Sequence, residues 1–363
     1  MAVYTSINDP SVHFQNTLYV GNGSNAQDIT NTGNANLQPD LIWIKDRSSN
    51  SNTIWQDTSR GINIQFFTDT TNTEYTNGNW GHVNSVASDG FQVDVGNNSS
   101  EANANKSGDN YIAWQWKANG GTTSSNSTGS RTTTVQVNST AKFSIFTYAG
   151  GGSGGTLGHS LGTVPHFIIV KSRNGSRDWC IYHHKNTSAP ETEFLSFNQN
   201  VATQDATVWN DTTPTTTLIS VSGDGKVGTD ENYVGYAFTE VQGFSKFGSY
   251  SGNGDADGPF IYTGFKPAWV LIKRTDSTGN WYLYDTERNG ASGPNTNQAH
   301  RILYANDASS EVNNVDRGID MVANGFKIRN TLGDTNNSSG TYIYASFASS
   351  PFVSSAGVPT TAR

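Results

Sequence analysis

The apolar positions of this chain alternate with polar ones in short runs and do not form helical stripes. In one such run, Ile112, Trp114 and Trp116 occupy every second position. A period of two, rich in β-branched and aromatic residues, is typical of a strand. Helical periodicity is almost absent, and the best short-helix candidate is residues 307–313. The alternation recurs in three six-residue segments: residues 111–116, 233–238 and 342–347.

A second pattern consists of a proline, an apolar run and a lysine six positions after the proline. It occurs at residues 39–45, 165–171 and 267–273. These runs are apolar on both faces, which predicts central strands covered on both sides. We expect each lysine to bury its stem and to place its ammonium group in water. Lys45, Lys171 and Lys273 would then mark equivalent positions in three copies of one folding module.

Two further signatures follow in the same order in each copy. A lone tryptophan comes soon after the lysine, and an aromatic residue is then followed seven positions later by Glu or Gln, as in Phe67 and Glu74. Repeated motifs of this kind indicate repeated structural units. We predict an all-β protein of three tandem β-sandwich units of the jelly-roll or lectin-like type. The recurring aromatics could stack on sugars, but their recurrence favours a core role, and we assign that role to Trp55, Trp179, Trp281, Trp116, Phe238 and Phe347.

Changes in composition place the boundaries between the units. Residues 119–134 lack apolar side chains and predict a Gly/Ser/Thr linker or an extended loop. Residues 242–247 instead join the second and third units through two aromatics, so we expect those two units to pack together and the first to be more separable. The predicted division is unit one at 1–118, the linker at 119–140, unit two at 141–242, unit three at 243–352 and a tail at 353–363.

Composition and charge exclude several classes of protein. The 363 residues carry a net charge of -8 and only 14% of them are charged, whereas a nucleic-acid binder needs a basic surplus. The longest apolar runs are four or five residues long, so no membrane span is expected, and residues 1–9 do not resemble a signal peptide. The single cysteine, Cys180, excludes an intrachain disulfide and a multi-cysteine zinc site.

The repeated unit resembles one found in virion proteins of tailed bacteriophages, particularly marine ones, of the tail-fibre or structural type. The stretches that carry the match most clearly are residues 9–23, 111–125 and 246–352, and the resemblance as a whole covers nearly the full chain. The resemblance implies a place in the virion, contacts with other virion proteins and a lectin-like fold. It supplies no catalytic residues.

Candidate binding residues lie outside the repeated set. Trp80 and His82, within residues 77–82, and Trp209, within residues 209–214, occupy loop-like contexts. Aromatics in loops are better candidates for recognition than aromatics that recur in every unit. The alternative for each is an ordinary structural role.

Metal sites are less well supported by the sequence. Asp255 and Asp257 place two carboxylates in one turn, as do residues 224–231, and oxygen ligands of this kind suit calcium. Neither segment matches a full calcium loop, and a solvated Asp-Gly turn is the alternative. His183 and His184 would point to opposite faces of a strand and so could not hold one ion together; we expect them at the surface. No cofactor is predicted, with calcium left open.

Enzyme signatures are absent, including a Gly-x-Ser-x-Gly elbow in a strand-to-helix setting, His-Glu-x-x-His and a phosphate-binding loop. We therefore predict a non-enzymatic virion protein, on a tail fibre or similar appendage, that binds a host-surface polysaccharide. It would be assembled in the host cytoplasm and act outside the cell. Many aromatics to bury, together with the resemblance, favour a homotrimer. The alternatives are a head-decoration or head-fibre protein and, third, a glycan-degrading enzyme.

Overall fold

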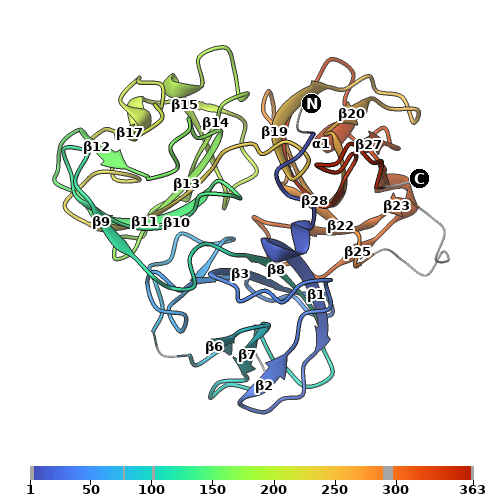
Figure 1. The fold of residues 1–363 in the computed structure, drawn as a ribbon, viewed down its shortest axis with the longest axis horizontal. Helices are drawn as coiled ribbons and strands as arrows, with labels where there is room; N and C mark the ends of the chain where they lie inside the picture. Colours follow the sequence, from blue (N-terminus) through green and yellow to red (C-terminus); the bar gives the residue numbers. More distant parts are fainter. Residues whose placement is uncertain (1–3, 77, 100–102, 289–296, 361–363) are drawn as a thin grey trace.

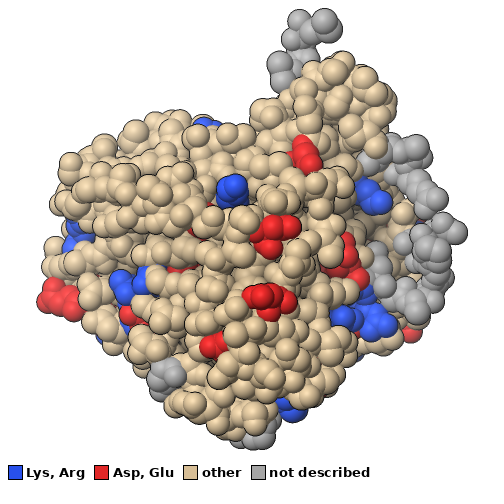
Figure 2. All heavy atoms as spheres, turned by 60° about the horizontal axis from the view of Figure 1, so that its bottom comes forward, with Lys and Arg blue, Asp and Glu red and all other residues tan. Residues whose placement is uncertain are grey.

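The computed structural model describes residues 4–76, 78–99, 103–288 and 297–360, and it is built almost wholly from strands. This confirms the all-β prediction. Three lobes surround a common centre (Figure 1). The first lobe holds β1 to β8, the second β9 to β18 and the third β19 to β28. In the described parts of the chain, no helix has the length and apolar character needed to cross a membrane. On the face drawn in Figure 2, basic and acidic side chains are scattered among uncharged ones.

Each lobe contains one large antiparallel sheet, and five strands follow one another in the same topological order in all three. The sheet of the first lobe has the order β1 (Phe14–Val20), β8 (Asn110–Trp116), β3 (Leu41–Asp46), β4 (Ile54–Asp57) and β5 (Gln65–Phe67). The second has β9 (Ser124–Asn126), β10 (Thr133–Asn138), β11 (Phe143–Ala149), β18 (Asn232–Phe238), β13 (Phe167–Ser172), β14 (Cys180–His183), β15 (Glu193–Ser196) and β16 (Gln204–Asp205). The third has β19 (Ser245–Ser251), β28 (Thr341–Pro351), β21 (Phe265–Arg274), β22 (Tyr282–Asp285), β24 (Arg301–Tyr304) and β25 (Val312–Asn313).

The proline-to-lysine runs form β3, β13 and β21, and each pairs with the strand built from an alternating segment. β3 and β13 are buried along their whole length. Apolar residues on both faces are required because each large sheet is covered on both sides. Facing residues such as Trp43 and Trp114, whose ring centroids are 5.1 Å apart, fix the register between strands.

Smaller sheets cover the outer face of each large sheet and enclose a separate apolar core in every lobe. They are β2 (Gln27–Ile29), β7 (Gly90–Asp94) and β6 (His82–Ala87) in the first lobe; β12 (Gly155–Gly158) and β17 (Leu218–Val221) in the second; and β20 (Phe260–Tyr262), β27 (Gly325–Ile328), β26 (Ile319–Val322) and β23 (Gln298–Ala299) in the third. Helices are limited to η1 (Pro10–Val12), η2 (Pro190–Thr192), η3 (Thr207–Trp209), η4 (Val315–Arg317) and α1 (Gly333–Asn336) among the described residues. The predicted helix at 307–313 was wrong, because that segment is a loop ending in β25.

The inner faces of the three large sheets pack against one another in a single aromatic core. Trp43 lies within it and contacts Phe197 of the second lobe and Trp269 of the third, at centroid distances of 5.3 and 6.2 Å. The six aromatics assigned to the repeat core are all buried there: Trp55, Trp179, Trp281, Trp116, Phe238 and Phe347.

The contacts between neighbouring lobes, here called seams, repeat in a cyclic order. Lys45 Nζ donates to Asp307 O of the third lobe at 2.6 Å. In the same way Lys171 Nζ donates to Thr71 O of the first lobe at 2.9 Å, and Lys273 Nζ to Asn200 O of the second at 3.3 Å. The three lysines therefore occupy similar surroundings.

The expectation that these ammonium groups reach water was wrong, because all three side chains are fully buried. Burial lowers the pKa of Lys45 and Lys273 to about 8 and that of Lys171 to about 7. Each buried amine hydrogen-bonds to oxygen acceptors, so its desolvation is offset in part.

The segment predicted as a linker, 119–140, is instead part of the second lobe. It contains β9 and β10, and β10 pairs with β11 along its full length. The buried carboxylate of Asp40 accepts hydrogen bonds from the N–H groups of Ala118, Gly120 and Gly121, at 2.7 to 2.9 Å. A residue far away in the sequence thus fixes a stretch that lacks apolar side chains.

The first lobe is no more separable than the others, which corrects the expectation drawn from that linker. Its Arg47 pairs with Glu311 of the third lobe at 2.8 Å, and its Glu74 pairs with Arg173 of the second at 2.8 Å. Near the other end of the chain, the predicted tail is described as far as residue 360 and folds back, with Asn8 and Ser355 joined by two hydrogen bonds.

Candidate functional site

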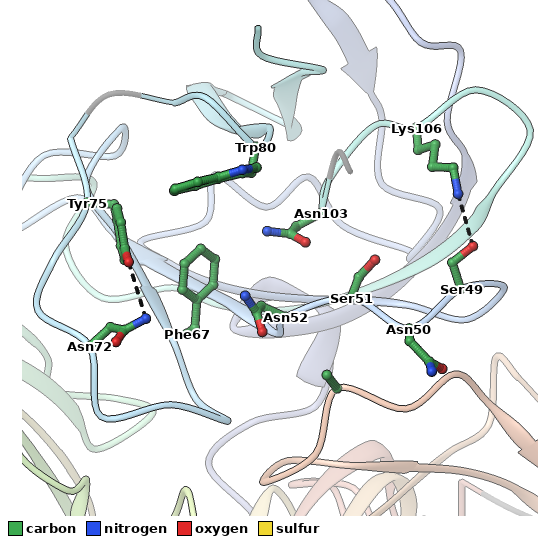
Figure 3. A pocket seen from close by; sticks show the side chains of 11 residues that line it. Ser49, Asn50, Ser51, Asn52, Phe67, Asn72, Tyr75, Trp80, Asn103 and Lys106 are labelled. Carbon is green, nitrogen blue, oxygen red and sulfur yellow. Dashed lines mark hydrogen bonds between the residues drawn. The ribbon is translucent and has the colours of Figure 1, made fainter. Parts of the chain in front are cut away.

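An open cleft of about 520 Å³ lies where the loops of the first lobe meet the third lobe (Figure 3). We call it the aromatic cleft. One polar segment, the aromatics around β5 and the loop after β7 build it, and the third lobe adds a single alanine. Its lining consists of Ser49, Asn50, Ser51, Asn52, Phe67, Asn72, Tyr75, Trp80, Asn103, Lys106 and Ala308.

Three aromatic rings form one wall of the aromatic cleft. The rings of Tyr75 and Trp80 meet edge to face with centroids 5.5 Å apart, and Tyr75 lies 5.3 Å from the buried Phe67. Asn72 Nδ2 donates to the Tyr75 hydroxyl at 3.2 Å, which fixes that ring (Figure 3). Trp80 is partly exposed and its loop is held by the Asn103 N–H, which donates to Trp80 O at 2.6 Å. The wall therefore offers a preformed apolar surface to a ligand.

Opposite the rings, amide side chains supply hydrogen-bonding groups. The side chain of Asn103 extends into the cavity (Figure 3), although the residue is only 7% exposed. Within the described parts of the chain, no hydrogen bond of the Asn52 or Asn103 amide is found, and neither amide is among the fully buried unpartnered groups, so both are accessible from the cleft. Asn103 thus has its stem packed in the protein and its free amide turned to the open cleft, where a ligand or water can bond to it.

The neighbouring charges compensate one another. Lys106 Nζ lies 3.2 Å from Asp109 Oδ2 and also donates to Ser49 Oγ. The pKa of Asp109 is lowered, as hydrogen bonds from Ser49 and Lys106 outweigh the opposing desolvation. Asp46, just behind the polar segment, has its pKa raised to about 6, mainly by burial. The ammonium group of Lys106 therefore adds no uncompensated positive charge to the cleft.

Of the three residues predicted to bind a ligand, only Trp80 lines the aromatic cleft. His82 lies behind its loop; burial lowers its pKa, and its Nδ1 is buried without a partner. A Cβ atom on Gly78 would lie 2.5 Å from the His82 ring, so the imidazole packs directly against the turn that carries Trp80. His82 is thus placed to support the cleft from outside.

Trp209 is not an exposed loop aromatic, which corrects its selection as a binding residue. It is 1% exposed, belongs to η3 and packs against Tyr182 in the core of the second lobe. The flanking Asn and Thr residues gave it a polar context in the sequence, but the short helix turns its ring inward.

The two aspartates proposed to bind calcium, Asp255 and Asp257, instead make contacts within the protein. Asp257 is paired with Lys327 at 2.9 Å and with Arg329 at 3.1 Å, and these cations lower the pKa of its carboxyl. Asp255 Oδ1 accepts the N–H of Asp257, as in a solvated turn. In the second acidic segment, Glu231 pairs with Arg177 at 2.8 Å. The arrangement does not direct carboxylates toward one common ion.

His183 is not at the surface, contrary to expectation. It is 1% exposed and its Nε2 donates to Tyr344 O at 3.1 Å across a seam. His184 stacks on His166 with centroids 4.2 Å and planes 17° apart, close to Glu240. An imidazole binds a metal in its own plane, so two nearly parallel stacked rings cannot both coordinate one ion. These three residues are therefore not a preformed metal site.

Comparisons with known proteins identify the family of the chain but no individual protein that matches it. A family model described as "Domain of unknown function (DUF7483)" matches residues 9–351. No curated protein matches the chain, and neither does any solved structure.

Proposed function

Since the chain belongs to the DUF7483 family, whose function is unknown, we propose a function from its site: a non-enzymatic, glycan-binding structural protein of a tailed-phage particle, carried on a tail fibre or similar appendage. The aromatic cleft supports glycan binding. The place in the particle is supported by the resemblance of residues 9–23, 111–125 and 246–352 to virion proteins.

The chemistry of the aromatic cleft suits a sugar ring. A pyranose has apolar faces that pack on aromatic rings such as Trp80 and Tyr75, and hydroxyl groups around its edge that pair with amides such as Asn52 and Asn103. The unpartnered, nearly buried Asn103 is the observation on which the proposal rests.

Binding is favoured over cleavage by the lining itself. Glycoside hydrolysis ordinarily needs two carboxyl groups about 5 to 10 Å apart. Among the residues described by the structure, no Asp or Glu lines the aromatic cleft. We therefore propose that the protein holds a glycan without breaking it.

The binding test uses the purified chain and polysaccharide extracted from the host envelope. We expect Trp80→Ala to weaken binding at least tenfold, because it removes the stacking surface, and Trp80→Phe to retain most of the affinity. Tyr262→Ala is a matched control, since Tyr262 is an aromatic of the third lobe that is 58% exposed. Equal affinities for the wild type and Trp80→Ala, by calorimetry or biolayer interferometry, would contradict the proposal.

The location test is antibody labelling of intact particles by electron microscopy, with the copy number measured in the same preparation. A fibre component is expected on an appendage in tens of copies. Label distributed over the head in hundreds of copies would instead identify a decoration protein, and shortened polysaccharide after incubation would identify an enzyme.

A further inference from the structure

We infer that the aromatic cleft selects an uncharged saccharide, one that presents hydroxyl or acetamido groups and no carboxylate, sulfate or phosphate. The inference rests on the proposed function and adds the class of glycan to it. It depends on the charges at the cleft, on the corresponding regions of the other seams and on the free hydrogen-bonding groups.

Lys106 is the only charged side chain among the described lining residues, and its charge is already compensated. Its ammonium group is shared between Asp109 and Ser49, and the Ser49 hydroxyl itself donates to Asp109 at 2.7 Å. An anionic sugar would have to compete with this carboxylate for the lysine and would lie close to its negative charge. An uncharged sugar neither competes with Asp109 for the lysine nor is repelled by the carboxylate.

The second seam provides a comparison within the same molecule. Beside the buried Lys171, where the second lobe meets Thr71 of the first, lies a smaller cleft of about 270 Å³. It corresponds in position to the aromatic cleft, which lies beside the buried Lys45. Its lining is charged and has no aromatic ring: Thr71, Ser176, Arg177, Asp178, Asp224, Gly225 and Lys226.

Near the buried Lys273 of the third seam, the third lobe carries an ion pair. There Arg274 pairs with Asp276 at 2.9 Å and also donates to Gly333 O of α1. The cleft beside Lys171 is thus lined by charged side chains, whereas the aromatic cleft has aromatics, amides and one compensated lysine. This aromatic and amide lining is a property of the residues of the first lobe and not of the shared fold.

The groups left free in the aromatic cleft match hydroxyl and acetamido partners. An Asn side chain offers one acceptor and two donor hydrogens, all uncharged. Asn52 and Asn103 can therefore each exchange hydrogen bonds with a group that both donates and accepts. A carboxylate or sulfate only accepts, so it would leave their carbonyl oxygens unpaired.

The test is an array of immobilised glycans that carries neutral, acetamido, uronic, sialic and sulfated members, probed at 50 and 500 mM NaCl. We expect signal on neutral or acetamido glycans, with less than a twofold change between the two salt concentrations, because no ion pair forms. Trp80→Ala should reduce that signal at least tenfold. Asn103→Leu, which has a similar volume and no amide, should do the same.

The possible outcomes distinguish a failure of the inferred glycan class from a failure of the proposed glycan binding. Binding to acidic glycans that depends on Trp80 and falls at high salt would overturn the uncharged class and leave glycan binding intact. Binding to no glycan, or binding that Trp80→Ala leaves unchanged, would overturn both. Circular dichroism and the melting temperature of each variant establish that it is folded.

Discussion

At the residue scale, buried polar side chains join parts of the chain that the sequence keeps far apart. Lys171 contacts Thr71 across one hundred positions, and Asp40 holds the backbone near Gly121. The sequence identified the three lysines as equivalent because their spacing from a proline repeats. It could not identify their acceptors, since the carbonyl of any residue is an equally good acceptor and only the fold selects one.

The buried lysines make stability depend on pH. The pKa of Lys171 is about 7 in the folded chain and near 10.5 in the unfolded chain, so unfolding takes up a proton between these values. The free energy of unfolding should therefore rise with pH in that window. From pH 7.5 to 9.5 we expect the wild type to gain about 2 kcal/mol more than Lys171→Met, by urea denaturation.

The exposed Lys185 supplies the control for that measurement, and Lys185→Met should keep the wild-type slope. Parallel pH profiles for the wild type and Lys171→Met would show that the amine of Lys171 is not desolvated in the folded protein.

At the element scale, strands that carry an apolar pattern were predictable and strands without one were not. β3, β8 and their counterparts follow from alternation and from the proline-to-lysine runs. β9 and the start of β10 were taken for a linker because residues 119–134 have no apolar side chain. β10 is ordered by its pairing with β11, by Val135, which is buried in the core of the second lobe, and by hydrogen bonds from Gln136 to Thr58 and Ser59.

Hydrogen exchange distinguishes a strand from a linker at this segment. We expect the amides of β10 to exchange slowly, at rates comparable with those of β11, because β10 lies between β9 and β11 in the sheet. The exposed turn at residues 153–154, for whose N–H groups no hydrogen bond is found among the described residues, should exchange within the dead time of the experiment. Exchange of β10 as fast as that turn would restore the linker interpretation.

The candidate site was only partly predictable for a related reason. Trp80 could be selected because it is an aromatic in a polar, glycine-containing loop outside the repeat. Tyr75, Asn52 and Asn103 carry no comparable signal in a chain rich in asparagine and tyrosine. They come together only because separate loops of the first lobe meet over β5, which short-range patterns do not encode.

At the scale of the whole molecule, the lobes share a core, so they should not unfold separately. Trp43 contacts aromatics of all three lobes. We expect one calorimetric transition, and Trp43→Ala should lower its midpoint while keeping it single, at a cost of about 3 to 5 kcal/mol. If the variant instead resolved two or three transitions, with only one of them shifted, the lobes would be independent domains.

The shared core also changes the argument for a homotrimer of chains. That prediction relied in part on the number of aromatics to be buried, and Trp43, Trp116 and Trp269 are buried together inside one chain. Burial of aromatics therefore no longer supports it, and the homotrimer stays a prediction that light scattering at micromolar concentration can check.

Joining three similar lobes in one polypeptide has an evolutionary consequence. In a ring of three identical subunits, every substitution is made three times, so a change that suits a ligand at one contact is imposed on the other two. Here each lobe is encoded separately, and its loops can diverge while the buried lysines and tryptophans hold the ring together. New specificities can then arise at one position without loss of assembly at the others.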